Sequence, residues 1–169
     1  MKKLILVRHA KSSWENDDWT DFERPLNDRG NKDAPIMADA IKDKGINPGL
    51  IISSPANRAV TTAKTYAQVL GYPEEAIITD MGIYEKGPKY IISLLKKTER
   101  KYDTVMLFGH NPDITSLASY FSGNHFDNVP TCGIVGIEFK INNWDDVETE
   151  NGELSFFEYP KKYKERLEA

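Results

Sequence analysis

The chain has 169 residues, of which 40% are hydrophobic and 28% are charged, a balance that is typical of one globular domain and excludes a disordered segment. Its net charge of -4 at pH 7 argues against a nucleic-acid partner, because general nucleic-acid binders display a basic face. Any anion site in this chain must therefore be a local basic pocket.

The apolar run at residues 4–7 is too short for a signal-peptide core or a membrane span, because Arg8 and His9 end it. We therefore expect a cytoplasmic protein without a membrane partner. Cys132 is the only cysteine in the sequence, so no disulfide can form within the chain. We expect it to be a small buried apolar residue.

Short apolar runs alternate with amphipathic stretches along the chain, and this alternation predicts a parallel sheet with helical crossovers. Four runs have the composition of strands buried in the middle of a sheet, and two later runs are typical of more peripheral strands. In chain order, the four are residues 4–7, 50–53, 76–79 and 104–108, and the two are residues 133–141 and 154–159.

Four helices are predicted between these runs. Asn27 caps the first, which runs to Lys44 and is stopped by Gly45, with a kink or a broken first turn at Pro35. The other three open, in chain order, at Ser54-Pro55, Gly87-Pro88 and Asn111-Pro112. The Ser and Asn of these pairs are capping residues placed before a proline suited to the first helical position.

No repeat, low-complexity tract or flexible linker divides the sequence. We therefore expect one domain over residues 1–160. A charged C-terminal tail follows over residues 161–169, and we expect it to be either a frayed helix or irregular.

Basic and imidazole side chains follow the ends of three predicted strands. Arg8 and His9 follow the first strand, Arg58 lies in the first turn of the second predicted helix, and His110 follows the strand that ends at residue 108. Ligands of open parallel sheets bind outside the carboxyl ends of the strands. We therefore expect these four side chains to share one crevice.

Two predicted helix N-termini face the same crevice, and their unpaired N–H groups favour a phosphate dianion. Arginine can hold two phosphate oxygens at once, and a neutral imidazole is a competent nucleophile toward phosphorus. An isolated Arg-His pair after a strand is more often a salt-bridged or capping pair, but the full set of four favours phosphoryl transfer. His125 has no comparable context, and we interpret it as an ordinary loop residue.

Several sequence blocks occur in the order of a known family. They are Leu-Val-Arg-His-Ala-Lys-Ser at residues 6–12, Arg24-Pro25-Leu26-Asn27, Arg29-Gly30, Ser53-Ser54-Pro55-Ala56 with Arg58 and Thr61-Thr62-Ala63, and Gly109-His110-Asn111-Pro112. The blocks span about residues 4–140 and resemble the SixA-type phosphohistidine phosphatase branch of the histidine phosphatase superfamily. This resemblance implies a phosphoglycerate mutase-like fold, which is a three-layer α/β/α sandwich with a mostly parallel central sheet, and no metal or organic cofactor.

The resemblance also implies roles for the four clustered residues. His9 would be the nucleophile that carries a covalent phosphoryl group, and the residues that bind this group would be Arg8, Arg58 and His110.

Three further residues are substrate-binding candidates. Lys11 and Ser12 follow the nucleophile closely enough to touch a phosphate oxygen, with a solvated loop as the alternative. Asn27 belongs to one of the family blocks, although helix capping explains it better than catalysis does.

Glu85 is our candidate general acid. It follows the strand predicted at residues 76–79 and precedes a helix start, so it should lie at the carboxyl edge of the sheet. A phosphate ester needs a proton on its leaving oxygen, which a carboxylic acid supplies. An exposed loop glutamate is the alternative interpretation.

An acidic run with interspersed aromatic residues follows the nucleophile, at residues 14–23. Such a run is usually a solvated surface. A rim that contacts a protein substrate is the alternative. Its members are Trp14, Asp17, Asp18, Trp19, Asp21, Phe22 and Glu23.

Together these features predict a phosphatase that acts on protein phosphohistidine or a related phosphorylated substrate. A small-molecule phosphomonoesterase or mutase on the same core, and a non-catalytic phosphohistidine-binding module, are the alternatives. A cysteine-based phosphatase is excluded because no arginine closely follows Cys132, and the sequence contains neither a zinc motif nor a Walker-type phosphate loop.

Overall fold

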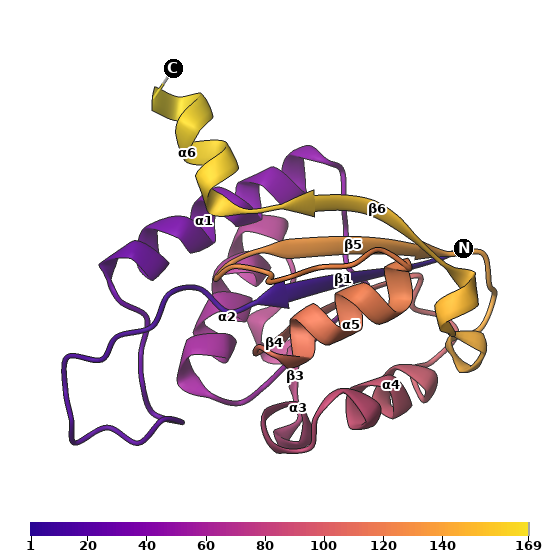
Figure 1. The fold of residues 1–169 in the computed structure, drawn as a ribbon, viewed down its shortest axis with the longest axis horizontal. Coiled ribbons are helices and arrows are strands. Elements are labelled where there is room, and N and C mark those ends of the chain that lie inside the picture. The colour runs from indigo at the N-terminus through magenta and orange to yellow at the C-terminus, as the bar shows by residue number, and fades with distance from the viewer. Residues whose placement is uncertain (169) are drawn as a thin grey trace.

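A six-stranded sheet forms the centre of the computed structural model, which describes residues 1–168 (Figure 1). The strand order is β3-β2-β4-β1-β5-β6. Strands β1 to β4 pair in parallel, whereas β5 and β6 are added in antiparallel pairing beside β1. The bounds are β1 Lys2–Arg8, β2 Leu50–Ser53, β3 Ile78–Thr79, β4 Thr104–Gly109, β5 Ile134–Phe139 and β6 Gly152–Glu158.

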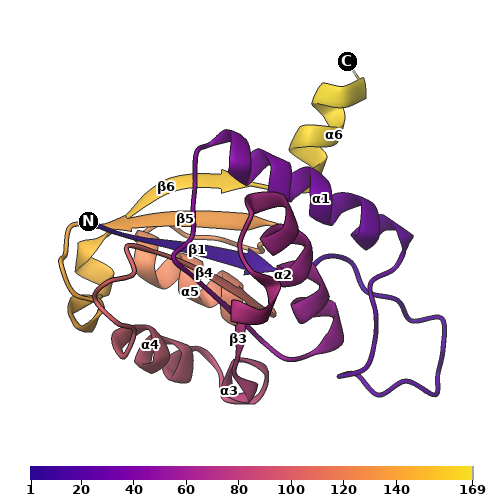
Figure 2. The ribbon, with the colours of Figure 1, turned by 180° about the vertical axis from the view of Figure 1, so that it is seen from behind.

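Helices cover both faces of the sheet, which confirms the predicted three-layer α/β/α fold with a mostly parallel sheet (Figures 1 and 2). One face carries α1 Asp28–Asp43 and α2 Asn57–Leu70, with α6 Pro160–Glu168 packed beside α1. The other face carries α3 Met81–Glu85, α4 Pro88–Lys96 and α5 Asp113–Ser122. Short 3-10 helices occupy residues Glu74–Ala76, Trp144–Asp146 and Thr149–Asn151.

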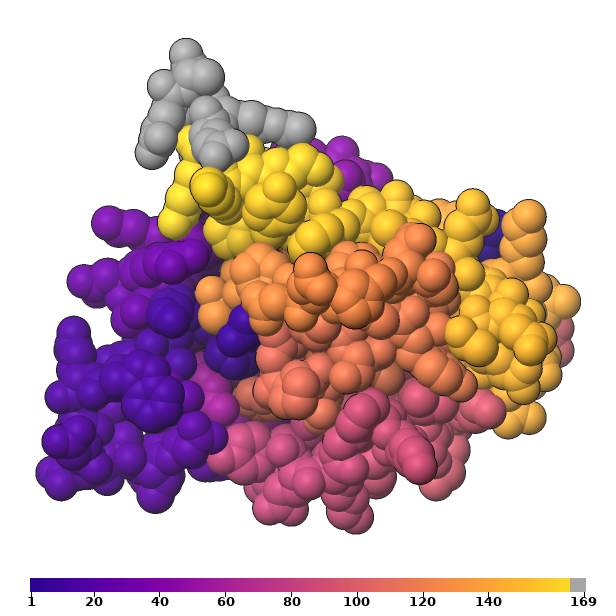
Figure 3. Space-filling model, in the orientation of Figure 1, coloured from indigo at the N-terminus to yellow at the C-terminus, as the bar shows by residue number. Residues whose placement is uncertain are grey.

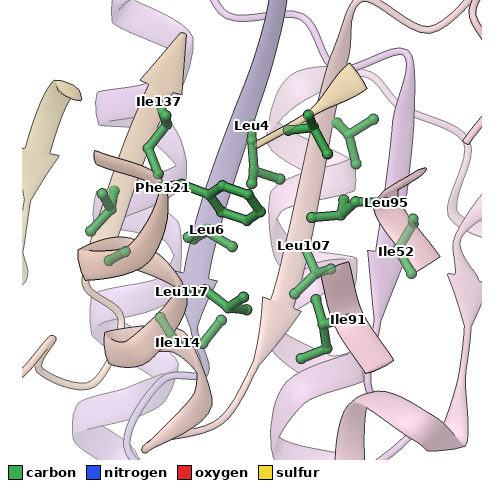
Figure 4. Packing of buried hydrophobic residues seen from close by; sticks show 14 of the residues in the cluster. Leu4, Leu6, Ile52, Ile91, Leu95, Leu107, Ile114, Leu117, Phe121 and Ile137 are labelled. Carbon is green, nitrogen blue, oxygen red and sulfur yellow. The ribbon is translucent and has the colours of Figure 1, made fainter. Parts of the chain in front are cut away.

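Side chains of β1 alternate between two apolar cores. Leu4 and Leu6 lie in the core on the α4 and α5 side, near Phe121 (Figure 4). Ile5 and Val7 lie in the core on the α1 and α2 side. Because both faces of β1 are buried, its sequence is a continuous apolar run rather than an alternating one.

Two strands lie elsewhere in the sheet than predicted. The run at residues 76–79 is predicted in the middle of the sheet, but β3 is a two-residue edge strand and both Ile78 and Thr79 are exposed. The reason is that β3 pairs with β2 alone, and Ala76 belongs to a 3-10 helix. Conversely, β5 is not peripheral, since it lies between β1 and β6 and is largely buried.

The predicted helix starts are correct in two of four cases. α4 begins at Pro88, as predicted, but α2 and α5 begin after Pro55 and Pro112, so neither of these prolines is the first helical residue. Ser54 does not cap α2 directly. Its Oγ accepts the N–H of Ala56 at 3.2 Å and so closes a turn that precedes the helix.

α1 begins and ends as predicted but is not broken. Asn27 Oδ1 accepts the N–H of Gly30 at 2.9 Å, and Gly45 follows the helix with a φ of 74°. The helix is continuous through Pro35 even though that proline lies beyond the first turn, where it removes a backbone hydrogen bond. Buried neighbours such as Met37 hold the helix against the sheet and offset this cost.

The tail after residue 160 is a helix, α6, up to residue 168. It contacts α1 through Lys164, whose Nζ lies 2.7 Å from Asp33 Oδ1. Across residues 1–168, no helix has the length and apolar character that a membrane crossing requires.

Candidate active site

The carboxyl ends of β1, β2 and β4 meet at one edge of the sheet, beside the segment that connects β1 to α1. This segment forms the indigo flank of the molecule in Figure 3. The N–H of His9 donates to Gly109 O at 3.1 Å, which joins the end of β1 to the end of β4. A cavity of about 330 Å³ opens here, and all four clustered residues line it, namely Arg8, His9, Arg58 and His110.

His9 is a buried, neutral imidazole, and one of its two ring nitrogens is hydrogen-bonded. Its Nδ1 lies 2.8 Å from Ala10 O, and only 7% of the residue is exposed. Burial, together with the nearby His110 and Arg58, lowers the pKa of His9 from 6.5 to about 3. A carbonyl oxygen can only accept, so Nδ1 carries the proton and Nε2 keeps the lone pair. The structure therefore leaves Nε2 as the nucleophilic nitrogen.

The loop that carries His9 is held by α2. The N–H of Ala10 donates to Thr62 Oγ1 at 3.1 Å, and that hydroxyl donates to Arg58 O at 2.7 Å. Thr62 is fully buried, so this link fixes the nucleophile relative to the first turn of α2.

His110 is the second neutral imidazole of the cavity. Its ring centroid lies 5.2 Å from that of His9, and burial, followed by the charge of Arg58, lowers its pKa to about 4. Its Nε2 lies 2.8 Å from Ser54 Oγ, which already accepts the N–H of Ala56. A hydroxyl donates one hydrogen bond and accepts up to two, so the contact fits the tautomer in which Ser54 donates to Nε2 and the ring proton is on Nδ1.

Three nitrogens of the clustered residues are buried and have no hydrogen-bond partner among the described residues. They are Arg8 Nε, Arg58 Nε and His110 Nδ1. Other nitrogens of the two arginines are engaged elsewhere, since Arg8 Nη1 donates to Val129 O at 3.0 Å and Arg58 Nη2 donates to Asp21 Oδ2 at 3.0 Å. Buried polar groups of folded proteins are normally paired, so these nitrogens indicate an anion site.

Asp21 is a member of the site that sequence reasoning missed. Its Oδ1 accepts from Arg24 Nη2 at 3.0 Å, and its Oδ2 accepts from Tyr84 at 2.7 Å in addition to Arg58. Although partial burial opposes ionisation, hydrogen bonds from Tyr84, Arg24 and Arg58 hold the pKa of this carboxyl well below its usual range. At neutral pH Asp21 is therefore a carboxylate, and although it is half exposed it is paired with two arginines.

Arg24 is a third arginine of the cavity. Its Nη1 donates to Ser12 Oγ at 2.7 Å, and its guanidinium carbon lies 3.5 Å from the centroid of the Trp14 ring. The sequence contained a signal for Asp21 and Arg24. Asp21 lies three residues before Arg24, a spacing that allows an ion pair, and Arg24 opens one of the family blocks.

The remaining candidates are divided between the cavity and its surroundings. Lys11 and Ser12 line the cavity, and Ser12 is buried. Asn27 does not line it. Its side chain caps α1, and its backbone N–H donates to Lys11 O at 2.9 Å. Glu85 is exposed at the end of α3 and is not among the lining residues, whereas its neighbour Tyr84 packs edge-on against His110.

Metal and thiol chemistry find no support in the described part of the chain. Residues 1–168 contain no group of three or more His, Cys, Asp or Glu side chains placed to hold a metal ion. Cys132 is buried, as predicted, and burial raises the pKa of its thiol to about 12. A thiol that stays protonated is a poor nucleophile.

Comparison with known proteins identifies a family model and several relatives that match this chain. The family model for the histidine phosphatase superfamily (branch 1) matches residues 4–86. A protein of unassigned function from Arabidopsis thaliana, described as chloroplastic, is 31% identical over 153 residues, which is 86% of this chain and 70% of that protein. The 2,3-bisphosphoglycerate-dependent phosphoglycerate mutase of Chelativorans sp. is 33% identical over 100 residues, and the match covers 58% of this chain but only 48% of the mutase.

The fold also has solved relatives. A SixA protein from Agrobacterium tumefaciens, whose phosphohistidine phosphatase activity is inferred, superposes with a TM-score of 0.79 at 26% identity, over 94% of this chain and 98% of that one. Sequence blocks, cavity and relatives agree, and the chain belongs to the histidine phosphatase superfamily.

Proposed function

We propose that this chain is a phosphohistidine phosphatase. His9 Nε2 attacks the phosphorus, and the phosphoryl oxygens are held by Arg8, Arg58 and His110 through their three unpaired nitrogens. Lys11 and Ser12 line the same cavity and supply further contacts to the phosphoryl group. The likeness to the Agrobacterium tumefaciens SixA protein supports the same substrate class.

The observation that carries this choice of substrate is that no carboxylic acid lines the described part of the cavity. None of the residues described as lining the cavity is Asp or Glu. Asp21, which contacts its arginines, is held ionised, and Asp113, whose pKa burial raises, does not line the cavity. An alkoxide leaving group needs an acid, whereas the imidazole of phosphohistidine leaves as a neutral ring that already carries a proton on its other nitrogen.

In both chemical steps the leaving group is a neutral imidazole. In the first, the bond from His9 Nε2 to phosphorus forms and the substrate P–N bond breaks, with its electron pair returning to the substrate imidazole. In the second, water attacks the phosphorus, and the electron pair of the Nε2–P bond returns to His9. Because Ala10 O keeps the Nδ1 proton in place at 2.8 Å, His9 also leaves as a neutral imidazole. The product phosphate retains one proton of the water, and the other passes to solvent.

The proposal includes the properties expected from the sequence. The enzyme works without a metal or an organic cofactor, it is cytoplasmic, and residues 1–160 form one histidine phosphatase domain. Its substrate is a phosphorylated protein rather than a nucleic acid or a membrane lipid.

The test is release of inorganic phosphate from a phosphohistidine protein, from an aryl phosphate and from an alkyl phosphate, with wild type and His9→Ala. We expect hydrolysis of the phosphohistidine protein to exceed that of the alkyl ester by about a hundredfold or more. His9→Ala should lose all turnover with its circular dichroism unchanged, and a chelator should have no effect. A preference for the alkyl ester would favour a phosphomonoesterase, transfer to a second substrate would favour a mutase, and binding without turnover would indicate a binding module.

A further inference from the structure

Trp14 is an exposed aromatic residue in the wall of the catalytic cavity. It is 71% exposed, yet it lines the cavity together with His9 and Arg58. The proposed chemistry at the phosphoryl group does not use it. An indole beside a phosphate pocket adds a flat apolar surface to a site whose other lining groups are polar.

The Trp14 ring is exposed, but a contact with Arg24 fixes its orientation. The guanidinium carbon of Arg24 lies 3.5 Å from the centroid of the Trp14 ring, which is the geometry of a cation–π contact. Arg24 is itself buried and is held by hydrogen bonds to Asp21 and Ser12. One face of the indole is therefore covered by a rigid group, and the rest of the ring remains open to a ligand.

We infer that Trp14 forms a subsite for a planar, aromatic leaving group attached directly to the transferred phosphorus. This inference rests on the proposed function and adds to it the recognition of the ring, as in the imidazole of phosphohistidine or the ring of an aryl phosphate. The indole stacks on that ring while the arginines and His110 hold the phosphoryl group. Stacking of two aromatic rings is worth about a two- to tenfold change in affinity.

Trp19 provides the matched control within the same loop. It lies in a separate hollow with Phe22, Pro55 and Val60, and it does not line the catalytic cavity. A loop whose aromatic residues merely dock a protein substrate would respond similarly to the loss of either tryptophan. A leaving-group subsite depends on Trp14 alone.

The test measures binding without turnover, by calorimetric titration with phenylphosphonate and with methylphosphonate. Both probes carry the same charged head, but only the first has a ring bonded directly to phosphorus. We expect wild type and Trp19→Ala to prefer phenylphosphonate by about two- to tenfold, Trp14→Ala to lose this preference, and Trp14→Phe to keep most of it. Methylphosphonate should bind all four proteins equally, which shows that the phosphate site and the fold are intact.

Two results would overturn the subsite. One is an unchanged preference in Trp14→Ala, and the other is an equal loss in Trp19→Ala. Because no catalysis is involved, the outcome is independent of the phosphate-release assay, so failure of the subsite and failure of the proposed function can be told apart. In that assay, Trp14→Ala should lower kcat/KM for phosphohistidine more than for phosphoramidate, which has the same P–N bond but no ring.

Discussion

His9 has two chemically different nitrogens because the backbone of the next residue selects one tautomer. Ala10 O accepts the Nδ1 proton at 2.8 Å, and burial keeps the ring neutral by lowering its pKa to about 3. The nucleophile is therefore ready at neutral pH without a general base. The same burial has a consequence for stability, since the unfolded chain restores an ordinary histidine pKa.

Between the two pKa values, about 3 and 6.5, the unfolded chain binds a proton at His9 that the folded chain excludes. The free energy of unfolding should therefore rise with pH through this window and level off above it. We subtract the free energy of unfolding of His9→Gln from that of wild type, both measured by urea unfolding. This difference should be about 2 kcal/mol lower at pH 5 than at pH 7, because wild type alone loses stability through His9. The exposed His125→Gln variant serves as control, and an equal change in both variants would show that His9 is not responsible.

Asp21 orients two of the three arginines of the cavity. It accepts hydrogen bonds from Arg58 and Arg24, both of which are buried. Replacing Asp21 by Asn keeps the shape but removes the charge. Because hydrogen bonds to a charged group are worth about 1.5–3 kcal/mol, we expect kcat/KM to fall by about ten- to a hundredfold.

Asp17→Asn, in the exposed part of the same loop, should leave kcat/KM unchanged. Vanadate should inhibit Asp21→Asn more weakly than wild type, with a larger inhibition constant. Its inhibition of Asp17→Asn should equal that of wild type. A rise in kcat/KM would instead mean that the Asp21 carboxylate competes with the phosphoryl group for Arg58.

At the scale of elements, the start of α1 is built against the loop that follows the nucleophile. A Cβ atom placed on Gly30 would lie 2.2 Å from Lys11 O, so only glycine allows this close approach of helix and loop. Asn27 joins the two, because its side chain caps α1 and its N–H donates to Lys11 O. The Arg29-Gly30 block thus has a packing explanation.

Asn27→Ala should therefore act on stability rather than on chemistry. Loss of the cap should lower the free energy of unfolding by about 1 kcal/mol, and Asn27→Asp should restore it. At saturating phosphohistidine substrate, kcat should change less than threefold, by our order-of-magnitude expectation for a capping residue. A hundredfold loss of kcat in a folded Asn27→Ala protein would return this residue to the substrate-binding set.

At the scale of the whole molecule, α6 closes the α1 side of the structure by pairing with a buried charge. Asp33 is fully buried in α1, and Lys164 Nζ lies 2.7 Å from its Oδ1, while the exposed Arg29 is 3.4 Å from its Oδ2. A buried carboxylate that loses a partner is costly even when a weaker partner remains.

Lys164→Ala should lower the free energy of unfolding by about 1–3 kcal/mol in urea titrations. Lys161→Ala, at an exposed position of the same helix, should have almost no effect. Adding Asp33→Asn to Lys164→Ala should recover part of the loss, since the uncompensated charge is then removed. Equal stability of the two single lysine variants would contradict the role of α6.

The sequence by itself determined that the sheet is mostly parallel, two of the four predicted helix starts, and the four clustered residues of the cavity. These depend on local features: apolar runs mark buried strands, and His9 and His110 directly follow such runs. Parallel strands bring their carboxyl ends to one edge, so residues far apart in the chain could be grouped without coordinates. The edge position of β3 escaped prediction because strand order depends on pairing, not on composition.

Only the tertiary structure decided how the loops complete the cavity. Arg58 meets Asp21 across 37 positions of the chain, and Arg24 positions Trp14 at the cavity wall. It also left Glu85 on the surface and brought its neighbour Tyr84 to His110. Loop conformations are set by such long-range hydrogen bonds and by charge, and these leave no periodic pattern in a sequence. For this reason the acidic run at residues 14–23 was interpreted as solvated surface, although its Asp21 binds two arginines of the cavity.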